Sequence, residues 1–440
     1  MDTIYIEGGI PLTGTVYMSG AKNSALKLIH VAMFSNEDII LMNVPRIGNI
    51  TVDLEIITQM GGKAEWLGNN RLLLNGSGLH TFEIPQELGA KYRTASLLAA
   101  PLLYRFGKAI VPKPGGCKIG PRPINRWVET WENLGISVTE TDNSYILESK
   151  SVEGCDINFK VKTHMGTDNA ILSSLFSKGV TTINNAAEEV EVDDLIDFCN
   201  LIGGNVKRLA PDRIQVTGAQ AFKGAVFSVQ NDRNEAVTFA IAAYLTKGDL
   251  TISGVNKGHL LSFCNTLNKI GCKYEFSKND MKVWYSGEEY LGTNITTSPA
   301  PGFMTDWQSL ITLLLTQAKG ESLVYDTVYT DRFGYTKDLN KMGADIELLQ
   351  PSTLDLDLVI SDDAYDISSK GEPFCVAKVT GPTKLKSSKL VVPDLRAGAT
   401  FVLAGLAAEG TTELSGYENI SRGYENFVDK LISLGAHINS

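Results

Sequence analysis

One glycine- and proline-rich segment carries the most reactive group of side chains in the chain. Residues 114–123 read PGGCKIGPRP, so Cys117 lies beside Lys118, and Arg122 is flanked by two prolines. Glycines let the backbone adopt positive φ and approach a ligand closely, whereas prolines restrict the conformations of a loop. Neighbouring cations favour the thiolate form of a cysteine. The segment predicts a loop in which Cys117 acts as a nucleophile or proton donor beside an anionic substrate; the alternative is a lone thiol in a surface loop.

Charged residues also lie at the starts of predicted helices. Six predicted helices begin with polar or charged residues before they turn apolar, at 21–24, 91–94, 166–169, 231–235, 304–308 and 394–397. Helix N-termini present free N–H groups and the positive end of a dipole, so several of them facing one cleft would bind an anion. Lys22, Arg93 and Arg396 oppose this dipole and need an anionic partner or solvent, which a ligand phosphate or carboxylate would supply. Ordinary N-capping explains the acidic residues at these starts equally well, namely Asp232, Asp306 and Asp394.

These helix starts belong to a repeat of about 70 residues. An apolar residue followed by glycine closes a predicted helix six times, at Met60-Gly61, Leu134-Gly135, Ile202-Gly203, Ile270-Gly271, Met342-Gly343 and Leu434-Gly435. The glycines are 74, 68, 68, 72 and 92 residues apart, which is too long for the common solenoids and predicts six copies of one unit. The additional residues of the last interval are expected in the polar stretch 361–388.

The first copy shows the content of the unit. Strand-like alternation covers 15–19, 38–44, 64–67 and 71–74, and helical spacing of apolar residues covers 21–34 and 52–60. The unit is therefore predicted to be βαβαββ. Three copies in each of two domains would give two similar α/β domains.

Composition limits the class of protein. A chain of 440 residues exceeds what one hydrophobic core usually supports, so two domains are expected. The formal net charge of −10 argues against a broad nucleic-acid surface. No apolar stretch is long enough to span a bilayer and the first residues lack the pattern of a secretory signal, so a cytoplasmic protein is expected. The cysteines lack metal-site or disulfide spacing, so neither a metal nor a cofactor is expected, and Cys199 and Cys264 are predicted to be buried, inert thiols.

Several motifs in order resemble one family. They are Ser19-Gly20-Ala21-Lys22-Asn23, the loop Gly115–Gly120 with Arg122-Pro123, Thr305-Asp306, Asp331-Arg332-Phe333, Asp394-Leu395-Arg396 and Arg422-Gly423-Tyr424-Glu425. Over essentially all its length the chain resembles the enolpyruvyl transferases, and its cysteine loop is similar to that of their nucleotide-sugar branch rather than of the branch that acts on shikimate 3-phosphate. The resemblance implies a two-domain inside-out α/β barrel built from six βαβαββ repeats. One domain would comprise 21–230 and the other 1–20 with 231–440.

The resemblance also implies a reaction. The enolpyruvyl group of phosphoenolpyruvate would pass to the 3-hydroxyl of UDP-N-acetylglucosamine with release of phosphate, the first committed step of peptidoglycan precursor synthesis. Cys117 would be the general acid, and the thiol that fosfomycin alkylates in this family, and Asp306 would accept the proton of the acceptor hydroxyl. Phosphoenolpyruvate would be held by Lys22, Arg122 and Arg422 at its phosphate and by Arg332 and Arg396 at its carboxylate. Lys22 and Arg396 would also belong to the catalytic set. The residues matched to the UDP-sugar are Asn23, Arg93, Arg122, Pro123, Ile124, Asn125, Lys162, His164, Gly166, Glu189 and Asp306.

The chain departs from the family pattern mainly on the uridine side. Residues 124–127 read INRW where the family usually has Val-Asp-Leu-His, and 162–168 read KTHMGTD where it usually has Lys-x-Ser-Val-Gly-Ala-Thr. Val190 stands where proline is common. His164 either stacks on or hydrogen-bonds to a base, or has no ligand role. Two alternatives therefore stay open: transfer to a different nucleotide or sugar acceptor, and a non-catalytic nucleotide-sugar binding protein, against which the retention of Cys117 and Asp306 weighs.

Overall fold

The chain forms two compact units, each with its own hydrophobic core. The computed structural model describes residues 3–115, 124–361 and 365–439. Unit 1 comprises the described residues of Met1–Ser19 and Asn231–Ser440, and unit 2 comprises those between Gly20 and Gln230. At the two points where the chain passes between the units, its outgoing and returning segments are hydrogen-bonded, since Ala21 N donates to Gln230 O at 2.7 Å and Asp232 N donates to Ser19 O at 2.8 Å.

Unit 2 contains three β-sheets among its described residues. In two of them an edge strand pairs in parallel with the first of three strands that are antiparallel to one another. The third sheet has three antiparallel strands, and at the corresponding edge Glu83 and Ile110 form an isolated parallel bridge. The sheets are β13 (Ala225–Ser228), β3 (Ile39–Met42), β5 (Arg71–Asn75) and β4 (Lys63–Gly68); β9 (Asp156–Asn158), β10 (Val180–Asn184), β12 (Arg213–Thr217) and β11 (Asn205–Ala210); and β6 (Lys108–Pro112), β8 (Ser144–Glu148) and β7 (Ser137–Glu140).

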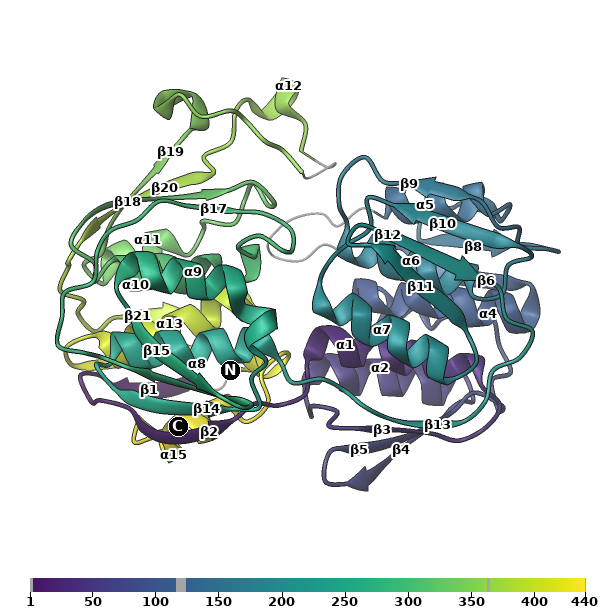
Figure 1. The fold of residues 1–440 in the computed structure, drawn as a ribbon, viewed down its shortest axis with the longest axis horizontal. Coiled ribbons are helices and arrows are strands. Elements are labelled where there is room, and N and C mark those ends of the chain that lie inside the picture. Colours follow the sequence, from purple (N-terminus) through teal and green to yellow (C-terminus); the bar gives the residue numbers. More distant parts are fainter. Residues whose placement is uncertain (1–2, 116–123, 362–364, 440) are drawn as a thin grey trace. The chain divides into compact units, whose positions relative to one another are not determined.

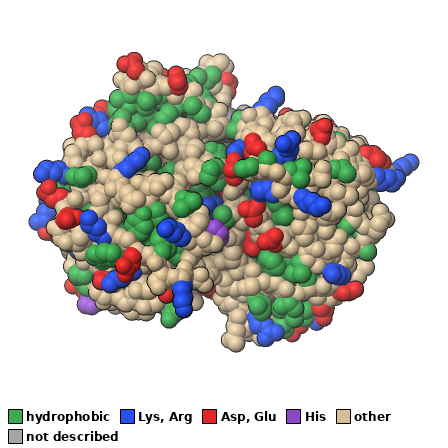
Figure 2. Space-filling model, in the orientation of Figure 1, with side chains coloured by type: hydrophobic (Ala, Val, Ile, Leu, Met, Phe, Trp, Pro, Cys, Tyr) green, Lys and Arg blue, Asp and Glu red, His purple; other side chains and the backbone are tan. Residues whose placement is uncertain are grey.

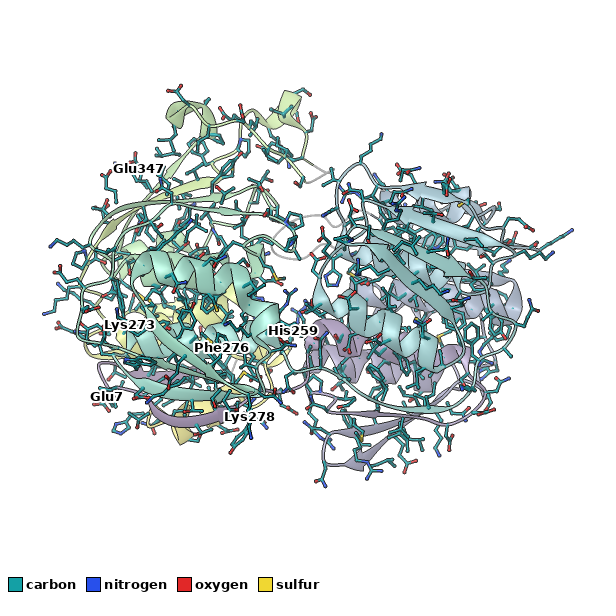
Figure 3. All side chains as sticks on the ribbon, in the orientation of Figure 1. Glu7, His259, Lys273, Phe276, Lys278 and Glu347 are labelled. Carbon is teal, nitrogen blue, oxygen red and sulfur yellow. The ribbon has the colours of Figure 1, made fainter. Side chains whose placement is uncertain are left out.

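Unit 1 contains three described sheets of the same order. They are β2 (Thr13–Tyr17), β14 (Asp249–Ser253), β16 (Asp280–Trp284) and β15 (Lys273–Ser277); β17 (Ile295–Thr297), β18 (Gly320–Asp326), β20 (Val376–Gly381) and β19 (Asp345–Leu349); and β21 (Lys389–Val391), β22 (Thr411–Ser415), β1 (Thr3–Glu7) and β23 (His437–Asn439). Polar side chains of the strands are exposed, as are Glu7 and Glu347, which Figure 3 labels near the edge of unit 1. On the face drawn in Figure 2, acidic and basic side chains are interspersed, so no large patch of one charge lies there.

Helices lie inward of the sheets in each unit, except that α12 (Ile367–Lys370) has no buried residue and projects from unit 1 (Figure 1). Those of unit 2 are α1 (Lys22–Val31), α2 (Gly48–Gln59), α3 (Gln86–Gly89), α4 (Ala99–Phe106), α5 (Asn125–Asn133), α6 (His164–Ser174), α7 (Val190–Leu201) and the 3-10 turns η1 (Ala32–Phe34) and η2 (Arg93–Leu98). Those of unit 1 are α8 (Arg233–Leu245), α9 (Leu261–Ile270), α10 (Gln308–Leu315), α11 (Thr336–Lys341), α12 (Ile367–Lys370), α13 (Leu395–Ala407), α14 (Glu418–Ser421), α15 (Phe427–Ser433), η3 (Lys257–Leu260), η4 (Thr305–Trp307) and η5 (Pro351–Leu354). Every residue of α8 and of α10 is buried, as expected of helices that lie inside a core. Helices inside and sheets outside are the predicted inside-out α/β arrangement.

The predicted repeat is present in the backbone. All six glycines that were expected to close a helix have positive φ, between 78° and 114°, which glycine adopts without steric cost. In the first copy the order β2, α1, β3, α2, β4, β5 matches the predicted βαβαββ unit, although α2 starts at Gly48 rather than at residue 52. The first strands of two copies are exchanged between the units. β2, which precedes α1 of unit 2, pairs with β14 in unit 1, and β13, which precedes α8 of unit 1, pairs with β3 in unit 2.

The additional residues of the long interval lie earlier than expected. In one sheet of unit 1 the paired strands β15 and β16 are joined by two residues. The strands at the same places in the next sheet, β19 and β20, are separated by residues 350–375, which contain η5 and α12. The predicted location at 361–388 is therefore only partly right, because 376–381 form β20. Polarity alone did not locate the insertion, since a polar stretch also follows β20.

Candidate functional site

Asp306 lies between two arginines in unit 1. Its Oδ1 is 3.1 Å from Arg332 Nη2 and 3.4 Å from Arg396 Nε. Met304 occupies the N-cap position of η4, and no side chain caps this turn. Of the two interpretations of Asp306, N-cap or participant in a charged site, the structure therefore favours the second.

Arg396 is fixed by its position at the start of α13 and by a chain of hydroxyls. Asp394 is the N-cap, and its Oδ1 accepts from the backbone N of Arg396 at 2.9 Å. Arg396 Nη1 donates to the hydroxyl of Tyr424 at 3.1 Å, and that hydroxyl lies 2.8 Å from Thr238 Oγ1. Because Thr238 donates its own proton to a backbone carbonyl, Tyr424 must donate to Thr238. Burial by itself lowers the pKa of Arg396, but Asp306 and Tyr424 outweigh it, and its pKa is raised.

A second carboxylate, Asp326 at the end of β18, organises the loop that carries Arg332. It is buried, and its Oδ1 accepts hydrogen bonds from Thr297 Oγ1 and from the backbone N–H groups of residues 328 and 329, at 2.9–3.0 Å. Its Oδ2 accepts from Thr305 Oγ1 at 2.7 Å, next to Asp306. Sequence reasoning missed Asp326. The sequence gives no clear signal for it, because the strand-forming residues Thr-Val-Tyr-Thr at 327–330 follow it directly.

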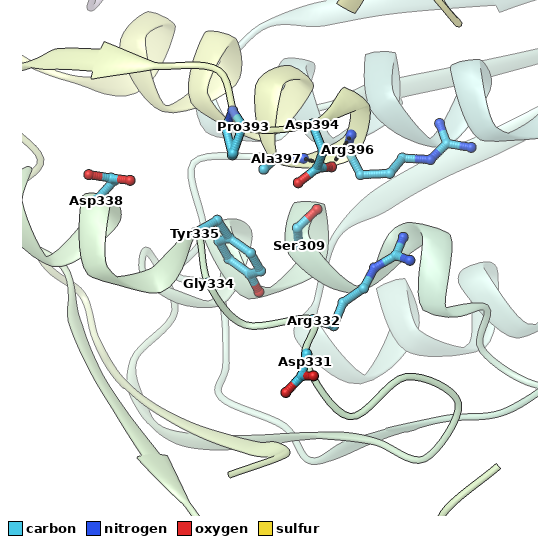
Figure 4. Close-up of a pocket in the computed structure, with 10 residues that line it drawn as sticks. All are labelled: Ser309, Asp331, Arg332, Gly334, Tyr335, Asp338, Pro393, Asp394, Arg396 and Ala397. Carbon is cyan, nitrogen blue, oxygen red and sulfur yellow. Dashed lines mark hydrogen bonds between the residues drawn. The ribbon is translucent and has the colours of Figure 1, made fainter. Parts of the chain in front are cut away.

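A pocket of about 200 Å³ opens beside the two arginines (Figure 4). It is lined by Ser309, Asp331, Arg332, Gly334, Tyr335, Asp338, Pro393, Asp394, Arg396 and Ala397. The side chains of Arg332 and Arg396 are only 11% and 10% exposed. Two guanidinium groups at the wall of a small pocket suit a planar carboxylate, which arginine binds with paired N–H donors.

In unit 2, the structure brings the starts of two helices together. Gln230 Nε2 donates to Ser24 Oγ on α1 at 3.2 Å and to Val190 O on α7 at 3.0 Å. Lys22 and Asn23 form the first turn of α1, and Glu189 is the N-cap residue of α7. The Glu189 side chain does not cap its helix, and its Oε2 is buried without a hydrogen bond to any described residue.

The other expected acceptor residues lie on three further segments of unit 2. Arg93 begins η2, and Asn125, which is exposed, begins α5. Ile124 is 1% exposed and packs in the core, so its side chain is not available to a ligand. Lys162 forms an ion pair with Glu188.

His164 and Gly166 lie in the first turn of α6, where the Thr163 side chain accepts a hydrogen bond from Gly166 N. His164 Nε2 lies 2.8 Å from the ammonium of Lys27, a buried residue of α1 that the sequence pattern did not single out.

Three predicted site residues, Cys117, Arg122 and Pro123, lie outside the described residues. Arg422 follows α14 and is partly buried. Cys199 and Cys264 are buried as predicted, and burial raises the pKa of both thiols. Asp232 and Asp394 are N-caps, whose side chains accept backbone N–H groups of α8 and α13. Within the described ranges no helix is both long and apolar enough to cross a bilayer, and no group of three or more His, Cys, Asp or Glu side chains is arranged to hold a metal ion.

Comparison with known proteins decides the family. The family model described as EPSP synthase (3-phosphoshikimate 1-carboxyvinyltransferase) matches residues 6–431. This chain belongs to the EPSP synthase family. It is 34% identical over 437 residues, 98% of this chain and 81% of the relative, to UDP-N-acetylglucosamine 1-carboxyvinyltransferase 1 of Legionella pneumophila (strain Lens). It is 35% identical over 433 residues, 98% of each chain, to the protein of the same name from Caldanaerobacter subterraneus subsp. tengcongensis.

Solved structures agree on the fold. The enolpyruvyl transferase NikO from Streptomyces tendae superposes with a TM-score of 0.86 at 22% identity, over 99% of this chain and 98% of that one. An EPSP synthase from Acinetobacter baumannii gives a TM-score of 0.71 at 15% identity over the whole of both chains. The resemblance to enolpyruvyl transferases and the inside-out α/β fold, both predicted from the sequence, are therefore confirmed.

Proposed function

We propose that this protein transfers the enolpyruvyl group of phosphoenolpyruvate to the 3-hydroxyl of UDP-N-acetylglucosamine and releases phosphate, a step that would serve peptidoglycan precursor synthesis. The observation that carries the proposal is identity of 34–35% along nearly the entire chain to proteins named for this reaction. The charged cluster of unit 1 supports it, because a carboxylate held between two arginines provides both a proton acceptor and an anion site.

We assign the carboxylate of phosphoenolpyruvate to Arg332 and Arg396. In the described structure Asp306 neutralises part of their charge at 3.1 and 3.4 Å. An incoming substrate carboxylate would share these guanidinium donors, and Asp306 would then lie near the reacting end of the donor. Lys22, Arg122 and Arg422 would hold the phosphate, whose departure needs cations to stabilise the developing charge.

The proton balance assigns roles to the acidic groups. As the acceptor oxygen bonds to C2 of phosphoenolpyruvate, its proton passes to Asp306 and a proton from Cys117 is added to C3. The resulting tetrahedral intermediate carries the acceptor oxygen, the carboxylate and the phosphate on C2. Phosphate then leaves from C2 with the proton held by Asp306, and the Cys117 thiolate takes back a proton from C3, which restores the double bond in the product and both acidic groups. Asn23, Arg93, Glu189 and the start of α6 would bind the acceptor.

Phosphate release tests the proposal directly. The purified protein would be given phosphoenolpyruvate together with UDP-N-acetylglucosamine, shikimate 3-phosphate, UMP or no acceptor. Release only with UDP-N-acetylglucosamine is expected. Release with another acceptor would keep the chemistry but refute the acceptor, and the absence of release with all of them would refute the proposed function.

A further inference from the structure

Gln230, the last residue of unit 2, connects the starts of two helices. Its Nε2 donates to Ser24 Oγ on α1 at 3.2 Å and to Val190 O on α7 at 3.0 Å. Its backbone O accepts from Ala21 N at 2.7 Å, and its backbone N donates to Asp194 Oδ2 on α7 at 3.4 Å. Both helices are thus fastened to one residue through its side chain and through its backbone.

The hydrogen bonds of Gln230, Ser24 and Asp194 close into a ring. The carbonyl of Val190 can only accept, so the Gln230 atom that contacts it is the amide nitrogen, and this nitrogen also donates to Ser24. Because the Ser24 oxygen accepts this hydrogen bond, its own proton remains for donation, and Asp194 receives it. Asp194 also accepts from the backbone N–H of Gln230, which closes the ring. Ser24 is fully buried, so solvent does not compete for its hydroxyl.

The carboxyl group of Asp194 titrates within the range of an enzyme assay. Burial raises its pKa to about 6, although the two hydrogen bonds of the ring and the Lys27 ammonium of α1 lower it. Glu191, one turn earlier on α7, adds to the increase of this pKa. Lys27 in turn lies 2.8 Å from Asp168 and from His164 of α6. A protonated Asp194 carries an O–H of its own and no charge, so it accepts the two hydrogen bonds of the ring less well than the carboxylate does.

Residues assigned to the substrates lie directly beside the ring. Lys22 and Asn23 precede Ser24 in the first turn of α1, and Glu189 precedes Val190 as the N-cap residue of α7. A shift of Ser24 or Val190 would therefore displace these neighbours through the backbone. Reacting groups that are misplaced by about 1 Å can lose about 10²-fold in rate, so the relative position of the two helix starts matters for the reaction.

We propose that Gln230, Ser24 and Asp194 are positioning residues for the reaction, and that their ring of hydrogen bonds holds the start of α1 against the start of α7. The ring sets the distance between the substrate residues of α1 and the substrate residue of α7, and none of its members is assigned to a substrate. The inference rests on the proposed function, because it takes the roles of these neighbours from that reaction.

Three substitutions open the ring at different points. Ser24→Ala removes only the hydroxyl, Gln230→Leu removes the amide at similar volume, and Asp194→Asn replaces the carboxylate by a neutral amide. The matched control is Gln59→Leu, which removes an exposed glutamine of α2 whose Nε2 donates to Glu55 on the same helix at 3.2 Å. Urea unfolding establishes that all four variants are folded under the conditions of the assay.

The first measurement is steady-state phosphate release at about pH 8, with each substrate varied in turn to give kcat and both KM values. Loss of one hydrogen bond of the ring should raise KM for UDP-N-acetylglucosamine and for phosphoenolpyruvate about fivefold or more, whereas the control should change by less than about twofold. A ring that only stabilises the fold would lower the urea midpoints and leave both KM values unchanged, and this result would overturn the inference. A wild-type protein that releases no phosphate with UDP-N-acetylglucosamine would instead refute the proposed function.

The second measurement repeats the assay between about pH 5 and 8 and compares KM of Asp194→Asn with KM of the wild type at each pH. The ratio of the two values cancels the groups that titrate in both proteins, including the phosphate of phosphoenolpyruvate. Because the wild-type carboxyl group is itself protonated below its pKa, we expect the ratio to fall from about fivefold at about pH 8 toward one at about pH 5, with a midpoint near pH 6. A ratio that is the same at both ends of this range would overturn the inference.

Discussion

Asp306→Asn is the most informative single substitution, because it removes one charge and changes almost no volume. Asp306 has two expected roles with different kinetic signatures. As the proton acceptor of the attacking hydroxyl it contributes to the chemical step, and its loss should lower kcat by about 10²–10⁴-fold. As a partner of Arg332 and Arg396 it competes with the substrate carboxylate, so its loss should not raise KM for phosphoenolpyruvate.

The structure gives the strength of the interaction between Asp306 and the two arginines. At 3.1 and 3.4 Å, each carboxylate–guanidinium pair has a gross attraction of about 5 kcal/mol at an effective dielectric constant of about 20. Most of this is offset by desolvation, since the three side chains are 10–25% exposed, and about 1–3 kcal/mol remains as the net value of a charged hydrogen bond. Asp306→Asn should therefore lower the free energy of unfolding by about that amount, while the two arginines bind phosphoenolpyruvate at least as tightly as before.

Steady-state phosphate release with each substrate varied in turn measures kcat and both KM values, and urea unfolding measures stability. The control is Asp345→Asn, which removes the same charge from an exposed residue of β19 and should change every parameter by less than about twofold. An unchanged kcat in Asp306→Asn would refute its role as proton acceptor. A raised KM for phosphoenolpyruvate with unchanged kcat would show that Asp306 assists donor binding instead.

Three further predictions concern other parts of the molecule. Asp326→Asn should lower the free energy of unfolding by about 1–3 kcal/mol, because a neutral amide replaces a carboxylate that accepts four hydrogen bonds. Thr305→Val removes one of these hydrogen bonds and should lower the free energy of unfolding by about 1 kcal/mol. Equal urea midpoints for the wild type and Asp326→Asn would contradict this prediction. Fosfomycin should inactivate the wild type and spare Cys117→Ser, measured as residual phosphate release, so that inactivation of the variant would rule out Cys117 as the target. Burial raises the pKa of Glu235 to about 7 despite the Lys430 ammonium 2.6 Å away, so the folded state keeps a proton that the unfolded chain releases from about pH 4.5 upward. Wild-type stability relative to Glu235→Gln should then fall by up to about 3 kcal/mol between about pH 4.5 and 7 and stay level above, and a difference that does not change with pH would refute this.

The sequence predicted the repeat well because its signals are local. A glycine after an apolar residue ends a helix through its own backbone conformation, and all six such glycines have positive φ. Periodicity likewise found the βαβαββ order, since helix and strand spacing are properties of short segments. The exchange of β2 and β13 between sheets was not predictable in this way, because alternation shows that a segment is a strand and carries no information about which strand it pairs with.

The site was predictable where the chain keeps the motifs of the family it resembles. Those motifs assigned Arg332, Arg396 and Asp306 to the donor and to proton transfer, and the structure places both arginines 3.1–3.4 Å from Asp306. Asp326 and Lys27 were missed because their importance comes from partners far away in sequence. Lys27, for example, interrupts the apolar spacing of α1, and only the fold shows that Asp168, 141 residues later, pairs with it.

The six helix starts divide into two groups by how their N–H groups are capped. Thr163, Asp232 and Asp394 cap α6, α8 and α13 with their own side chains. At α1, η2 and η4 the N-cap positions hold Ala21, Tyr92 and Met304, and no side-chain cap serves them. A helix start without a side-chain cap leaves its N–H groups to backbone, solvent or ligand. These are the starts that carry Lys22, Arg93 and Asp306, which were assigned to the substrates from the sequence. The division does not separate core from ligand, however, because Arg396, assigned to the carboxylate of phosphoenolpyruvate, follows the capped start of α13, and the capped start of α6 is assigned to the acceptor. A side-chain cap is compatible with an anion site, since it satisfies only one or two of the N–H groups at a helix start.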